Sequence, residues 1–140
     1  MPAKVFLDAN IIVYAHDRAR PDRRAQSQAI LFESLRNGTG VISSQVLSEF
    51  FVTITQKVKQ PMSSAAAKKE IVLLSTLETV DIDATLVVEA VNIKERWQLS
   101  YWDALILAAA ERAGCGTVYS EDMSDGQHYG SLVVCNPFTT

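Results

Sequence analysis

Short apolar runs recur along the chain, and nearly all of them are separated by longer segments whose apolar residues have helical spacing. The runs cover residues 4–7, 41–43, 79–82, 117–120 and 132–134. Strands this short and this apolar are typical of a parallel sheet that helices cover on both faces. Because no linker, repeat or low-complexity tract interrupts the pattern, it predicts one α/β domain over residues 1–140.

Polar residues at the starts and ends of the apolar segments predict where the helices lie. Ser44, Ser63 or Ser64, Asp83 and Ser100 each precede such a segment and are expected N-caps. Another helix is expected from Ala25 to Asn37, with Gly38 as its C-terminal stop. A short helical stretch is expected to open at Asn10.

Composition narrows the class of protein. Thirteen Lys and Arg against 16 Asp and Glu give a net charge of −3, which argues against a nucleic-acid binder that relies on bulk positive charge. It leaves open a protein that reaches phosphate through a bound metal. The longest apolar run, residues 104–110, is far below the ~20 residues that a membrane span needs. Two cysteines outside any C-x-x-C pair indicate reduced thiols, so we expect a soluble cytoplasmic protein with no membrane association.

Asp103 is the acidic residue that composition and pattern single out first. It lies in a segment, residues 101–110, that is apolar nearly all round, and a buried carboxylate costs several kcal/mol unless it is paired, hydrogen-bonded or metal-bound. The spacing to Ser100 also fits a capping box, in which the carboxylate would support the helix start. Both interpretations remain open, and they are compatible.

Three other acids have ordinary explanations when taken singly. Asp8 follows the first apolar run and would serve as a helix cap, whereas Asp122 follows a later run and would lie in a solvated loop. Glu49 falls well off the apolar face of its predicted helix, which by itself indicates a solvated side chain.

Considered together, the acids indicate a metal site. Asp8, Asp103 and Asp122 fall at strand exits or helix starts, on the edge where a parallel sheet binds its ligands. Two carboxylates ~5 Å apart repel each other by about 3 kcal/mol at an effective dielectric of ~20, so such a cluster requires protons or cations. Oxygen ligands without His or Cys suit Mg²⁺ or Mn²⁺, and phosphodiester hydrolysis is the chemistry that needs this cage.

Other functional motifs are absent or weak. The chain has no G-x-x-x-x-G-K-[ST] loop and no dinucleotide-binding glycine pattern. A basic cluster, Arg18, Arg20, Arg23 and Arg24, belongs to a solvated connection or contacts RNA phosphates or an acidic partner.

Four segments in this order resemble the motifs of the PIN-domain family, and more narrowly the VapC-type toxins of toxin–antitoxin pairs. They are residues 6–14 with their Asp-Ala-Asn turn, residues 44–50, residues 101–106, and residues 119–123 followed by Gly126 and residues 136–138. The resemblance covers essentially the whole chain. Each motif alone is weak, but four in register are fairly specific.

The resemblance implies a five-stranded parallel sheet flanked by helices, with strand order 3-2-1-4-5. It implies that four acids converge on Mg²⁺ or Mn²⁺: Asp8, Glu49, Asp103 and Asp122. Ser120 would accompany the last acid and Asn10 would support the first, and the nearby Glu121 and Asp125 leave the fourth ligand ambiguous. For Glu49 we follow the resemblance rather than the helical pattern. It further implies an endoribonuclease that acts on RNA, is inhibited by a cognate antitoxin, and forms a homodimer.

Two alternatives remain. A haloacid-dehalogenase-like phosphatase would use Asp8 as its nucleophile, but Asn10 stands where that family has a second Asp. A non-catalytic module would keep the fold and use its acids to bind ions or a partner.

Overall fold

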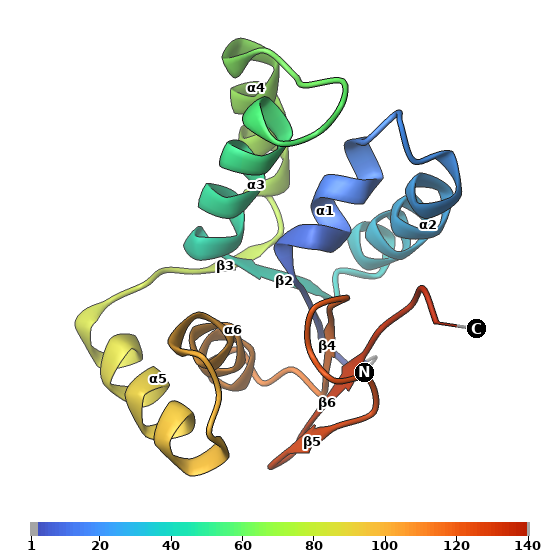
Figure 1. Cartoon of the computed structure of the whole chain (residues 1–140). Helices are drawn as coiled ribbons and strands as arrows, with labels where there is room; N and C mark the ends of the chain where they lie inside the picture. Colours follow the sequence, from blue (N-terminus) through green and yellow to red (C-terminus); the bar gives the residue numbers. More distant parts are fainter. Residues whose placement is uncertain (1–2, 140) are drawn as a thin grey trace.

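The computed structural model describes residues 3–139, which form a six-stranded sheet between two groups of helices (Figure 1). The strands are β1 Val5–Leu7, β2 Gly40–Ser43, β3 Glu78–Val80, β4 Thr117–Tyr119, β5 His128–Tyr129 and β6 Leu132–Cys135. The helices are α1 Ala9–His16, α2 Pro21–Asn37, α3 Ser44–Gln56, α4 Ser64–Leu74, α5 Ala84–Trp97 and α6 Tyr101–Arg112.

The sheet order is β3-β2-β1-β4-β6-β5, and all neighbours are parallel except β5 and β6. The five parallel strands are the five predicted ones, in the predicted order. The expected strand number was nevertheless wrong, because β5 adds an antiparallel edge. This strand has only two residues, and it reaches β6 through a tight turn at Gly130, whose φ is 63°. A pattern of apolar runs cannot detect a strand this short.

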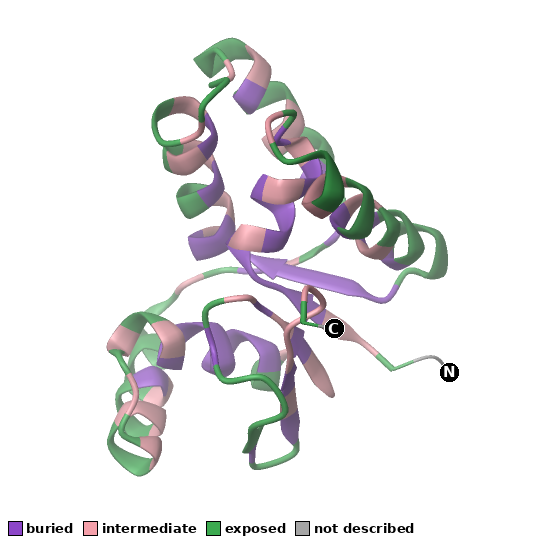
Figure 2. Cartoon of the chain, turned by 45° about the vertical axis from the view of Figure 1, so that its right-hand side comes forward, coloured by how far each residue is buried: buried purple, intermediate pink, exposed green. Residues whose placement is uncertain are grey.

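Helices α1 to α4 lie on one side of the sheet, and α5 and α6 lie on the other (Figure 1). Figure 2 shows that buried residues gather on the strands and on the helix faces turned toward the sheet. Helix α6 packs against β2, β4 and β6, and α5 packs outside it. Every residue from 104 to 110 is buried, as the sequence pattern predicted. None of the helices within residues 3–139 has the length and apolarity of a membrane span.

Most of the predicted helix caps are confirmed. The side chains of Ser63, Asp83 and Ser100 accept hydrogen bonds from backbone amides in the first turns of α4, α5 and α6. Gly38 ends α2 with a φ of 66°, a conformation that glycine adopts without steric cost.

Two helix starts differ from the prediction. Ser43, not Ser44, caps α3, because the extended backbone of β2 turns into the helix with no intervening loop, and Ser43 Oγ accepts from the Val46 amide at 3.3 Å. The Ser44 hydroxyl instead accepts from the amide of Ile82. Helix α2 begins at Pro21, earlier than expected, because proline is compatible with the first helical turn.

Candidate active site

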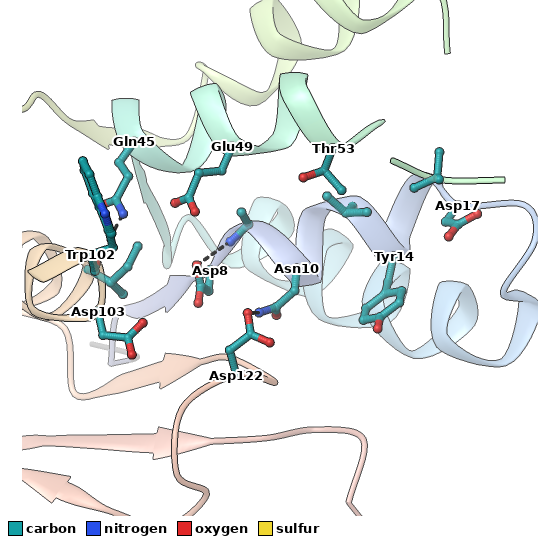
Figure 3. Close-up of a pocket in the computed structure, with 14 residues that line it drawn as sticks. Asp8, Asn10, Tyr14, Asp17, Gln45, Glu49, Thr53, Trp102, Asp103 and Asp122 are labelled. Carbon is teal, nitrogen blue, oxygen red and sulfur yellow. Dashed lines mark hydrogen bonds between the residues drawn. The ribbon is translucent and has the colours of Figure 1, made fainter. Parts of the chain in front are cut away.

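A cavity of about 350 Å³ opens beside the carboxyl ends of β1 and β4 (Figure 3). Its walls come from the start of α1, from α3, from the start of α6 and from the loop after β4. All four acids that the sequence singled out line this one cavity: Asp8, Glu49, Asp103 and Asp122. The parallel sheet brings them together because it aligns the ends of its two central strands at one edge.

Asp8 is the most constrained of these acids. It follows β1, caps α1 and is only 7% exposed. One carboxylate oxygen accepts from the backbone amide of Ala9 at 2.7 Å, and the other accepts from the hydroxyl of Ser120 at 2.8 Å. Burial raises the pKa of Asp8, these two hydrogen bonds oppose the rise, and the charges of Asp122 and Asp103 add to it. The predicted capping role and a site role therefore coexist.

Ser120 and Asn10 connect Asp8 to the loop that carries Asp122. The buried Ser120 hydroxyl donates to Asp8 and accepts from the Asp122 amide at 3.2 Å. Asn10 donates from Nδ2 to the Asp122 carboxylate at 3.1 Å, and its Oδ1 accepts from the Glu121 amide at 3.2 Å. Asn10 was expected to support Asp8, but these bonds hold the Asp122 loop instead, because its side chain extends across to that loop (Figure 3).

Glu49 and Asp103 reach the cavity from helices on opposite sides of the sheet. Burial raises the pKa of Glu49, the charge of Asp8 adds to the rise, and hydrogen bonding by Gln45 opposes it. Burial also raises the pKa of Asp103, hydrogen bonding by Ser100 opposes this, and the charge of Asp122 adds to the rise. Glu49 lies off the apolar face of α3 and is exposed, as the helical pattern indicated, and it also lines the cavity.

The cavity lining holds oxygen donors and no side chain with a positive charge. Its acids are the four named above and Asp17, whose carboxylate accepts from the backbone amide of Ala19. Carboxylates without His or Cys are the donor set that Mg²⁺ and Mn²⁺ prefer, so the chemistry of the lining fits such an ion. Across residues 3–139, however, no three His, Cys, Asp or Glu side chains are grouped closely enough to hold a metal.

None of the four predicted RNA-binding arginines lines this cavity. The Arg23 guanidinium stacks over the Phe138 ring at 4.4 Å and pairs with Glu121 at 3.0 Å. Arg20 lies over the Tyr14 ring at 5.5 Å. Arg18 and Arg24 line a separate hollow between α1, α2 and α4. The structure therefore splits the cluster, and its role in binding RNA remains a prediction.

The sequence interpretation missed several residues of the cavity wall, among them Gln45 and Trp102. Gln45 is one helical turn before Glu49, and its side chain donates to the Trp102 carbonyl at 3.3 Å. Trp102 lies immediately before Asp103 and is 64% exposed. An aromatic residue at the start of a helix, beside a candidate ligand, was the available signal for Trp102.

Comparisons with known proteins identify the family. The family model of the PIN domain matches residues 5–124. No protein with a curated description matches the chain significantly.

Several solved structures share the fold. A sarcin-ricin loop cleaving toxin of Mycobacterium tuberculosis, VapC20, is 19% identical with a TM-score of 0.68, over 85% of this chain and 90% of that one. A toxin–antitoxin complex from Klebsiella pneumoniae matches at 18% identity and a TM-score of 0.70, over 98% of this chain and 100% of that one. VapBC2 of Rickettsia felis, bound to a DNA fragment from its promoter, matches at 22% identity and a TM-score of 0.65, over 93% and 96% of the two chains. The fold agrees throughout, and since the family model spans most of the sequence, this chain belongs to the PIN domain family.

Proposed function

We propose that this chain is a divalent-metal-dependent endoribonuclease and the toxin of a toxin–antitoxin pair. The observation that carries the proposal is the single cavity in which Asp8, Glu49, Asp103 and Asp122 meet with no positive side chain to balance them. Membership of the PIN family and the shared fold with a toxin that cleaves RNA support the same conclusion.

Each acid has a proposed role. Asp8 and Asp103 would be the principal ligands of Mg²⁺ or Mn²⁺, and Asp122 would complete the acidic pocket. Glu49 would bind the metal directly or through water, and its carboxylate would help to activate the attacking water. When bound, the ion supplies Lewis acidity that favours deprotonation of water and stabilises charge on the phosphate.

The supporting residues position these groups. Ser120 donates to Asp8 and so keeps one of its oxygens from rotating, while the Ala9 amide holds the other. Asn10 fixes the carboxylate and the loop of Asp122. Preorganised ligands lose little freedom on binding a metal, so these bonds would favour both affinity and rate.

A partner antitoxin would inhibit the enzyme in the cytoplasm. The solved structures that share the fold include a toxin–antitoxin complex and a VapBC pair bound to promoter DNA, and by analogy we infer a cognate antitoxin. The homodimer that the family resemblance implies stays a prediction. The absence of three converging ligands among the described residues favours one rival, a non-catalytic module that keeps the PIN fold. The phosphatase alternative loses its support because the family match is to the PIN domain.

The test is RNA cleavage by purified protein freed of any partner, with Mg²⁺ or Mn²⁺ and with a chelator. We expect cleavage that requires the metal and is lost in Asp8→Asn. Asp81→Asn, which changes an exposed acid outside the cavity, is the matched control and should cleave like wild type. Equal activity of Asp8→Asn and wild type would refute the catalytic assignment, and no cleavage or metal binding in calorimetry would favour the non-catalytic module.

A further inference from the structure

Trp102 stands at the boundary between the acidic cavity and a second hollow. It lines both the acidic cavity and a neighbouring space of about 580 Å³. The side chain is 64% exposed, although tryptophan usually buries most of its surface in a folded protein. The largest exposed aromatic group of the described chain therefore lies directly before the candidate ligand Asp103.

Neighbouring residues hold Trp102 in place. The ring of Tyr101 meets the indole edge-on, with centroids 5.1 Å apart and an interplanar angle of 76°. The Gln45 amide donates to the Trp102 carbonyl and ties the start of α6 to α3. An indole has only two χ angles to order, so it loses little conformational freedom when another ring stacks on it.

The second hollow combines apolar and hydrogen-bonding groups and has no positive charge. Ile82 and Leu105 contribute apolar surface, Ser44 and Ser48 contribute hydroxyl groups, and Glu49, which also lines the acidic cavity, contributes a carboxylate. Gln45, which is 8% exposed, lies in the wall shared with the acidic cavity, and its buried Oε1 has no hydrogen-bond donor within the described residues. Because this oxygen is itself buried, a ligand in the hollow does not reach it in this side-chain arrangement, and the hydroxyl groups of Ser44 and Ser48 are the hydrogen-bonding groups that the hollow offers. These features suit the flat ring and edge of a nucleobase rather than a phosphate.

We propose that Trp102 is a stacking platform for an unpaired base of the RNA next to the phosphate that is cleaved. The inference rests on the proposed ribonuclease function and adds a specificity-determining residue to it. Bases in a duplex are already stacked on their neighbours, so this platform requires a single-stranded or looped substrate.

Intrinsic fluorescence offers a direct test, because the chain has two tryptophans. The other one, Trp97, packs edge-on against Tyr129 and does not line the acidic cavity. In the Asp8→Asn background, which prevents turnover, Trp97→Phe leaves Trp102 as the only indole and Trp102→Phe leaves Trp97. Titration with a mixed-sequence single-stranded oligoribonucleotide and Mg²⁺ should quench the fluorescence of the Trp97→Phe variant and not that of the Trp102→Phe variant. A duplex of the same sequence should quench neither.

Affinity measurements with the same oligoribonucleotide complete the test. Trp102→Ala should weaken binding about tenfold, within the range of single base–aromatic stacking, whereas Trp102→Phe keeps a ring and should lose much less. If wild type and Trp102→Ala bind the oligoribonucleotide with equal affinity, and the fluorescence of Trp102 is not quenched, the inference is wrong. A changed oligomeric state of Trp102→Ala in analytical ultracentrifugation would overturn it too, by assigning the residue to a protein interface.

If Trp102→Ala binds and cleaves RNA like wild type, the inference fails and the proposed ribonuclease function stands. If wild type binds RNA through Trp102 but never cleaves it, the proposed function fails alone.

Discussion

The two sides of the acidic cavity are built differently. The anchored side consists of Asp8, Asn10, Ser120 and Asp122, which are joined by hydrogen bonds between segments 112 positions apart in the chain. On the open side lie Gln45, Glu49, Trp102 and Asp103. On this side, the hydrogen bonds that lower the pKa values of the two acids come from residues nearby in the sequence. Gln45 has this effect on Glu49, and Ser100 has it on Asp103.

This difference indicates how the site would accept a cation. The anchored side fixes carboxylate positions before anything binds, since each oxygen of Asp8 already has a donor. The acids of the open side lie on two helices and can adjust by side-chain rotation. A divalent ion held by Asp8 would therefore meet fixed groups on the anchored side and adjustable groups on the open side.

The largest effect is expected from breaking the anchored side at Asp8. Because Asp8→Asn removes the charge of a principal ligand, cleavage should fall about 100-fold or more, the loss expected when several kcal/mol of transition-state stabilisation disappear. Single-turnover cleavage of an RNA substrate measures this. Circular dichroism should show an unchanged fold, and a rate within threefold of wild type would contradict the assignment.

A smaller loss is expected from Ser120→Ala, which leaves the Asp8 charge but removes its donor. Metal affinity or activity should fall by about 10- to 100-fold, as is typical when a residue that orients a ligand is lost. Removing the donor from a buried carboxylate should also cost about 1–3 kcal/mol of stability. Titration of Mg²⁺ against rate separates affinity from rate. Thr53→Ala, in the same cavity but without a hydrogen bond to these acids, is the control. Equal losses of metal affinity in Ser120→Ala and Thr53→Ala would show that the hydrogen bond from Ser120 does not position the Asp8 carboxylate.

Metal removal should destabilise the protein in a pH-dependent way. The pKa values of Asp8, Glu49 and Asp103 are raised in the folded state, so without metal their ionisation opposes folding. The contribution of these groups to the free energy of unfolding is therefore greatest below their ordinary pKa values. It declines as the pH rises through their raised pKa values in the folded state. Added Mg²⁺ binds the ionised form and should restore about 2.7 kcal/mol at 100 times its Kd.

Thermal unfolding at several pH values, with Mg²⁺ or EDTA, measures this coupling. The gain from Mg²⁺ should be full at neutral pH and should shrink in acid, where protons compete for the carboxylates. Ionic strength is matched with NaCl. A stabilisation by Mg²⁺ that does not change as these carboxylates become protonated would mean that the ion binds outside the acidic cavity.

The smallest effect is expected from Asp103→Asn in EDTA. Neutralising one acid of the open side removes a charge that burial and Asp122 disfavour, so the melting temperature at pH 7 should rise by about 2 °C. The same variant should lose the stabilisation by Mg²⁺ and the RNA cleavage. A lower melting temperature in EDTA would instead assign Asp103 a structural role at the start of α6.

The sequence predicted the parts of this molecule that depend on local patterns. The five parallel strands, the buried helix after Asp103 and most caps follow from apolar runs and capping residues. Asp8 was predictable as a cap because its position directly after β1 determines that contact.

What was missed depends on contacts between distant segments. Glu49 lies off the apolar face of its helix, and only the family resemblance indicated that it faces a site. The bonds from Asn10 to the Asp122 loop and the position of Trp102 between two cavities follow from tertiary packing, which no helical or strand period encodes. The roles of all these residues in catalysis remain predictions.

The stacking of Arg23 on Phe138 has a practical consequence for work with this protein. Arg23 also pairs with Glu121, whose backbone amide donates to Asn10. Through Arg23, the segment after β6 is therefore in contact with the loop that carries Asp122. Changes to the segment that holds Phe138 would therefore act on the loop of Asp122 as well as on local packing, and fusions for purification and assay are better placed away from it.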